Sequence, residues 1–341
     1  MQNNFYFCIE ITKNKELLGM QKLFFELLQV ALGQLDCLSR GPLPDEWYEL
    51  YHIAQRQGLV GICYKGVERL FEYGLRAPQD LCIDWMADTE SIRETQELID
   101  RRCQKLMDKL AERKIRSSAM SALAIRQYKV EGLHHFSQLA AIDVFVDCSM
   151  ERAIKFARQT GQEIVPHNYT SLVLKQWDDM SASLHYRIFS ARNPFANHRM
   201  QKWFNQHKEL MFQYDQEVAI PSMTMNAICM LQELQQRLFS GELALRYFVD
   251  LFFVLNQLKG AFDTFRENTS PEAVFKMIGL QRFASGVMWV LQETVALNHE
   301  YMLCPPIEEE GRFILQEVMA EKRHPLRLWC HYPMEMIWPK R

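Results

Sequence analysis

The 341-residue sequence has little of what marks several protein classes. Its 14 glycines and 12 prolines are too few for a collagen-like or linker-rich chain. Its nine cysteines include no closely spaced pair, which argues against a disulfide framework or a cysteine-rich zinc site and favours reduced thiols. The most apolar run, residues 247–255, contains Asp250 and is far shorter than the roughly 20 residues of a membrane helix. These absences leave an ordinary globular protein.

Neither positive nor negative charge is in large excess, because 39 Lys+Arg and 42 Asp+Glu give a net charge of −3. This balance gives no electrostatic case for nucleic acid or an anionic membrane as partner. The N-terminus has no basic segment, and Glu10 interrupts the apolar stretch that begins at Phe5, so we expect no secretion signal and a cytoplasmic location. Hydrophobic residues make up 48%, enough for a sizeable core, and the length predicts about two domains.

Apolar spacing predicts helices at both ends of the chain and a mixed segment between them. Residues 15–75 have helical spacing, and residues 88–113 form the clearest helix, which Asp88 or Thr89 can cap. The middle segment is expected to contain strands at 115–120, 142–147 and near 162–166, 171–176 and 181–188, with helices at 121–129 and 149–159. Helical spacing returns at 200–207, 222–238, 243–258 and 281–297.

Several stretches between residues 45 and 255 carry a likeness to one protein family. They include Gln57-Gly58-Leu59-Val60-Gly61, Arg101-Arg102-Cys103, Ala141-Ile142-Asp143-Val144-Phe145-Val146, Leu184-His185-Tyr186, Asn193-Pro194-Phe195-Ala196-Asn197-His198-Arg199 and Leu245-Arg246-Tyr247-Phe248-Val249-Asp250. In their order and spacing they resemble the bacterial nucleotidyltransferase-like proteins of the polymerase-beta superfamily. The resemblance implies an α+β fold with a small mixed-sheet core at 111–220, an N-terminal helical region at 1–110 and a C-terminal helical region at 221–341.

The chemistry of that superfamily needs residues of particular types. Two acids one residue apart on a strand lie on one face, and with a third from a neighbouring strand they hold two divalent cations that bridge the nucleotide phosphates. A turn with lysine and glycine at the start of the preceding helix offers backbone N–H groups and charge to phosphate.

This sequence departs from the superfamily pattern at most of those positions. The first strand acid falls at Ala141, the second is Asp143, and the third falls at Ser183. The lysine–glycine turn falls at Met120-Ser121-Ala122. Because metal ions supply several kcal/mol to phosphoryl transfer, the loss of two of three ligands is expected to cost at least about a thousandfold in rate.

The resemblance therefore implies a set of candidate residues, each with a structural alternative. Asp143 is a vestigial catalytic residue and the metal ligand if there is any, or else a surface or capping residue. Asp147, Asp178 and Asp179 rebuild an acidic site if the fold brings them to Asp143. Ser121 and Ala122 present amides to an anion, or Ser121 simply caps the helix.

Two further sets of residues have the same two-sided interpretation. Arg246 and Asp250, four apart on a helix, either bind nucleotide or form an intrahelical ion pair. His185 either orients a substrate or is a hydrogen-bonded packing residue. A basic and aromatic segment, residues 187–203, is interpreted as a local connector and not as a binder of single-stranded nucleic acid.

We expect a catalytically degenerate nucleotidyltransferase-like protein that acts as a binding or regulatory component. One alternative is an active Mg²⁺-dependent transferase of a nucleoside monophosphate to a hydroxyl, using a relocated acidic cluster; another is a nucleotide sensor without transfer. No cofactor is expected for the first, and Mg²⁺ with a nucleoside triphosphate for the active form. The partner is an unidentified protein or small molecule; nucleic acid is unlikely and a membrane is not expected.

Overall fold

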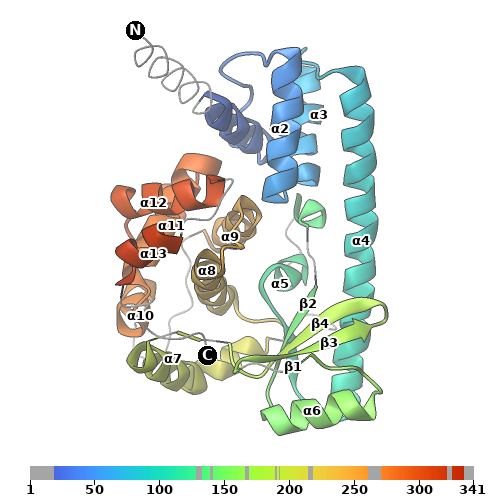
Figure 1. Ribbon diagram of the computed structural model, residues 1–341, viewed down its shortest axis with the longest axis vertical. Helices are drawn as coiled ribbons and strands as arrows, with labels where there is room; N and C mark the ends of the chain where they lie inside the picture. The colour runs from blue at the N-terminus through green and yellow to red at the C-terminus, as the bar shows by residue number, and fades with distance from the viewer. Residues whose placement is uncertain are drawn as a thin grey trace.

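The computed structural model describes residues 19–127, 133–138, 141–165, 169–188, 190–191, 193–213, 218–259, 270–320 and 325–333. A small sheet lies beside one long upright helix, and a group of helices occupies the other side of the molecule (Figure 1). The N-terminal elements are helical residues 19–31 followed by α2 (Pro44–Gln57), α3 (Val60–Glu72) and α4 (Gln79–Glu112).

Helix α4 is longer than the sequence pattern predicts. It runs unbroken for 34 residues, with Pro78 at its N-cap position, so the expected cap at Asp88 or Thr89 is wrong. The Thr89 hydroxyl instead donates to the Trp85 carbonyl within the helix, and Asp88 accepts from Tyr51 of α2. No residue after Pro78 breaks the helix, so it extends from residue 79. The predicted start lay later because the stripe of apolar residues becomes regular only further along the chain.

The sheet has four strands in the order β1-β2-β4-β3: β1 (Ser117–Ala119), β2 (Ile142–Val146), β3 (Ser171–Trp177) and β4 (Met180–His185). Strands β2 and β4 are parallel, and the other two pairs are antiparallel. The helices of this unit are α5 (Ser121–Gln127) and α6 (Met150–Gln159), with a 3₁₀ turn at η1 (Leu133–Phe136). Of the strand expected near 162–166, the described residues 162–165 form one isolated bridge, between Ile164 and Leu174.

The sheet is attached to α4 on one side and to α7 on the other. Trp177 of β3 donates its indole N–H to the Arg102 carbonyl of α4 at 3.1 Å. Phe145 of β2 meets Phe204 of α7 edge to face at 5.4 Å between ring centroids. Helix α7 begins at Pro194, earlier than predicted, because Asn193 caps it and proline suits its first turn.

The C-terminal half is helical, as expected. Its elements are α7 (Pro194–His207), η2 (Lys208–Met211), α8 (Met223–Ser240), α9 (Leu245–Leu258), α10 (Pro271–Ile278), α11 (Gln281–Val295), η3 (His299–Tyr301), α12 (Glu308–Met319) and α13 (Pro325–His331). A small mixed sheet with helices before and after it agrees with the expected α+β class. Within the described ranges, no helix is both long and apolar enough to cross a membrane.

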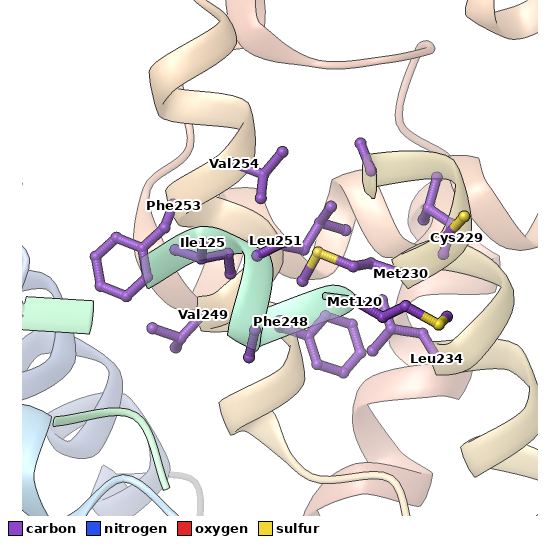
Figure 2. Close-up of a cluster of buried hydrophobic side chains, with 14 of the residues drawn as sticks. Met120, Ile125, Cys229, Met230, Leu234, Phe248, Val249, Leu251, Phe253 and Val254 are labelled. Atoms are coloured by element: carbon purple, nitrogen blue, oxygen red, sulfur yellow. The ribbon is translucent and has the colours of Figure 1, made fainter. Parts of the chain in front are cut away.

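Short helix α5 is fixed by burial against α8 and α9. Figure 2 shows Ile125 of α5 among Met230 and Leu234 of α8 and Phe248 and Val249 of α9. All five side chains are buried. On its other side α5 is held to α4, where the Arg126 guanidinium donates to Asp100 at 2.9 Å. This packing fixes the start of α5 between the sheet and α8.

Candidate functional site

Two adjoining cavities open where the start of α5, strand β2 and helix α8 meet. The strand-side cavity has a volume of about 290 Å³ and is lined by residues of β2, β4, α5, α8 and α9. The helix-side cavity has a volume of about 420 Å³ and is lined mainly by α8 and the segment after β4. Both cavities are lined by Met120, Ser121, Asp143, Glu233 and Arg237, so they form one cleft.

The strand-side cavity brings together five of the candidate residues of the sequence analysis. Asp143 comes from β2, Ser121 and Ala122 from α5, and Arg246 and Asp250 from α9. These elements lie far apart in the chain, and only the tertiary packing makes them neighbours.

The three strand positions at which the resemblance predicts acids also meet in this cavity. The parallel register pairs Asp143 with Ser183, and side chains two apart on a strand share a face, which places Ala141 next to them. All three residues line the strand-side cavity. The site therefore contains one methyl group, one carboxylate and one hydroxyl where the superfamily pattern has three carboxylates.

His185, two residues beyond Ser183, is the direct partner of Asp143. Its Nε2 lies 2.9 Å from the Asp143 Oδ1. Burial works to raise the pKa of Asp143, but the hydrogen bond and charge of His185, the charge of Arg237 and a hydrogen bond with Ser183 outweigh it, so the pKa lies below its ordinary value. The carboxylate is thus kept ionised by fixed protein groups.

Sequence reasoning missed two charged residues of the cleft, Glu233 and Arg237. They stand four apart on α8, and the Arg237 Nε donates to Glu233 Oε1 at 2.8 Å. Helix α8 is otherwise largely buried, and its apolar spacing predicts a helix without indicating which of its side chains reach a cleft. An acid–base pair at i,i+4 spacing within so apolar a helix was the signal that could have identified them.

Ser121 is held by α8. Its hydroxyl donates to the Glu233 carboxylate at 2.6 Å, and its backbone N–H donates to the Asn226 side chain at 3.1 Å. Asn226 in turn donates to the Ser121 carbonyl at 3.2 Å. The Ser121 amide, one of the two that the resemblance offers to an anion, is therefore already bonded.

Arg246 and Asp250 do not pair with each other in the described part of α9. The Arg246 guanidinium donates to the Gln138 carbonyl and to the Tyr247 hydroxyl. Asp250 accepts from the Ser137 hydroxyl at 2.6 Å and is 4% exposed. Burial raises the pKa of Asp250 to about 7, although the Ser137 hydrogen bond and the charge of Arg246 oppose it.

The acidic residues proposed to rebuild a site lie elsewhere. Asp147 is bound by Arg116 at 2.7 Å and Lys208 at 2.8 Å, and Asp178 by Lys105 at 2.6 Å. At about 3.3 Å per strand residue, Asp147 is about 13 Å along β2 from Asp143. Asp179, in the β3–β4 turn, is about as far from Ser183. The structure does not bring these three acids to Asp143.

The residues present do not fit a two-metal centre. Mg²⁺ is held by oxygen ligands and chiefly by carboxylates, and the three strand positions supply one carboxylate. Among the residues that the structure describes, no group of three or more His, Cys, Asp and Glu side chains is arranged to hold a metal ion. No catalytic step through a bound metal is therefore derived for this chain.

A small mixed sheet whose strand positions 141, 143 and 183 line a helix-walled cleft has the organisation of a nucleotidyltransferase-like protein. Residues 44–296 match the family described as uncharacterised nucleotidyltransferase, so the chain belongs to that family. The match covers all the stretches on which the resemblance was based and confirms a nucleotidyltransferase-like family. Searches of curated proteins and of solved structures find no match.

Proposed function

We propose that this chain is a catalytically degenerate nucleotidyltransferase-like protein that acts as a binding or regulatory component. The proposal is supported by the set of residues at the three strand positions of the cleft, Ala141, Asp143 and Ser183. A methyl group cannot coordinate a cation, and a neutral hydroxyl does not balance its charge. The remaining carboxylate, Asp143, is occupied by His185.

Calorimetric titration of the protein with ATP, CTP, GTP and UTP, each with and without MgCl₂, tests this proposal. We expect no magnesium-dependent heat of binding, because the metal that would carry the triphosphate has too few ligands. A micromolar response that requires Mg²⁺ would contradict the proposal. A response that is independent of Mg²⁺ would favour a nucleotide sensor without transfer.

A variant that restores the acids shows whether the cleft still accepts a nucleotide. In the triple variant Ala141→Asp, Ser183→Glu and Ser121→Lys, the missing carboxylates and the lysine return to the wall of the strand-side cavity. Gain of Mg-nucleotide binding would indicate a vestigial but intact pocket and support the sensor. No gain, in a variant with the circular dichroism of the wild type, would count against the sensor.

One observation favours a second candidate, an active Mg²⁺-dependent transferase. Glu233 lines both cavities together with Asp143, so the acids of a relocated site would be these two. Incubation of cell lysate with the protein and α-³²P-labelled nucleotides tests this candidate. Label transferred by the wild type and abolished in both Asp143→Asn and Glu233→Gln would establish the transferase, and equal background in all three would exclude it.

A further inference from the structure

The cleft already contains a cation of its own, the guanidinium of Arg237. Besides its Nε bond, Arg237 approaches Glu233 Oε1 through Nη2 at 2.7 Å, so two of its nitrogens hold one carboxylate. Its guanidinium carbon also lies 4.1 Å from the centre of the Tyr247 ring. These contacts fix the group in position, because a planar guanidinium bonded through two nitrogens and stacked on a ring loses its rotational freedom.

Arg237 lies where the negative charge of the cleft is concentrated. It lines both cavities together with Glu233 and Asp143, and its side chain is 26% exposed. Burial works to lower the pKa of Arg237, but the charge and hydrogen bond of Glu233 and the charge of Asp143 outweigh it, so the pKa lies above the ordinary value. The interaction is mutual, since the charge of Arg237 helps to lower the pKa of Asp143.

A guanidinium and a divalent cation compete for the same negative charge. Carboxylates that face a common cavity repel one another unless a cation lies between them, and a bound Mg²⁺ or a fixed arginine can each supply that charge. The arginine cannot lose its proton in a protein, so this neutralisation does not vary with pH. It also needs no dissolved metal.

We propose that Arg237 takes the place of a divalent cation in this cleft, and that removal of its charge makes Asp143 and Glu233 a divalent-cation site. The proposal rests on the proposed function, because it gives the physical reason why the remaining acids need no metal. It assigns Arg237 as the residue that sets the cation specificity of the cleft. The bond between Ser121 and Glu233 belongs to the same arrangement, since the carboxylate is held from both sides.

The test is calorimetric titration of Arg237→Gln with MnCl₂, beside the wild type. We expect the variant to bind one Mn²⁺ at least tenfold more tightly than the wild type does. Arg237→Lys keeps the charge and is expected to behave like the wild type. Arg312→Gln is the matched control and should give no gain. Arg312 also pairs with a glutamate four residues before it, Glu308, at 2.8 Å, and both side chains are exposed on α12.

Two double variants identify the ligands. Arg237→Gln combined with Asp143→Asn, and Arg237→Gln combined with Glu233→Gln, should each lose the gained Mn²⁺ site. A folded Arg237→Gln variant that binds Mn²⁺ no better than the wild type overturns the proposal. A gain that persists in both double variants overturns it too, because the metal would then be held elsewhere.

The same comparison can be made in a background with additional carboxylates in the cleft. Ala141→Asp with Ser183→Glu supplies added carboxylates, and the variant can be prepared in MnCl₂ with and without Arg237→Gln. We expect Arg237→Gln to tighten Mn²⁺ binding at least tenfold there as well, and equal affinities would contradict the proposal. If the wild type binds Mg-nucleotide, the proposed function fails on that result alone, whereas the role of Arg237 is decided by the ratio between matched variants.

Discussion

At the scale of single residues, Asp250 couples the stability of the protein to pH. Its carboxyl is buried among apolar side chains of α9, and burial raises its pKa to about 7 from an ordinary value of 3.8. The native state therefore holds a proton that the unfolded chain releases between about pH 4 and pH 7. Stability contributed through this group is highest at low pH and falls as the pH rises through the folded pKa.

The variant Asp250→Asn should remove this pH dependence. Asparagine stays neutral and its carbonyl oxygen can still accept from the Ser137 hydroxyl, which lies 2.6 Å from Asp250. At about 1.4 kcal/mol per pKa unit, we expect the variant to gain on the order of 2–4 kcal/mol of unfolding free energy at pH 8 and less than half as much at pH 5. Urea denaturation at both pH values measures it.

Asp84→Asn on the exposed side of α4 is the control for the loss of a carboxylate, and should change stability little at either pH. Equal stability of Asp250→Asn and the wild type at pH 8 would show that the native carboxyl is not destabilised. A gain of the same size at pH 5 would show that it arises from packing and not from protonation.

The sequence identified some residues of the cleft and missed others for a physical reason. Asp143, Ala141 and Ser183 follow from a strand pattern in which alternate side chains share a face, and that rule is local. Glu233 and Arg237 reach the cleft only because α8 packs across the start of α5, as the bonds from Ser121 to Asn226 and Glu233 show. Such long-range packing leaves no local pattern in the sequence.

At the scale of elements, the end of α2 determines where Arg246 of α9 can lie. Gly58 ends α2 in the left-handed conformation with φ of 66°. A Cβ at this position would lie 2.7 Å from the Cδ of Arg246. Glycine at position 58 therefore allows the left-handed turn and also the close approach of Arg246, which lines the strand-side cavity.

Gly58→Ala should destabilise the protein more than Gly74→Ala does. Gly74 also has a positive φ, of 81°, but a Cβ there would meet nothing within 4 Å. Both variants bear the left-handed strain of about 1 kcal/mol, and only Gly58→Ala must also displace the Arg246 side chain. The difference between their urea midpoints measures that contact, and equal midpoints would show that Arg246 moves aside without cost.

The elements that the sequence predicted well are those bounded by local signals. Strand β2 is a short apolar run, and α6 begins where Ser149 caps it through a bond to the Arg152 amide. The start of α4 was misplaced because interior Thr89 has the chemistry of a cap, and only the context of the helix shows that its hydroxyl bonds to Trp85. The segment expected as a strand near 162–166 forms one isolated bridge over its described residues 162–165.

At the scale of the whole molecule, one cluster of buried hydrophobic side chains includes residues from Leu23, near the start of the described chain, to Tyr332, near its end. Gln57 joins distant parts of the chain within it. Its side chain is 7% exposed, accepts from the Leu245 amide at 2.8 Å and donates to the Val318 carbonyl at 3.2 Å. It thereby satisfies the first N–H of α9 and a carbonyl in the last turn of α12, neither of which has a partner within its own helix.

The described parts of the chain should therefore unfold in a single transition, and Gln57→Leu should lower the temperature of that whole transition. Leucine fills similar space but leaves a buried amide and a buried carbonyl unpaired, each at a cost of about 1–3 kcal/mol.

Gln55→Leu, on the exposed side of the same helix, is the control and should shift the transition little. Calorimetry with tryptophan fluorescence checks this, because Trp47 in α2 and Trp203 in α7 are both buried. Two separate transitions, with only one moved by Gln57→Leu, would mean that the N-terminal and C-terminal helices fold independently despite their shared core.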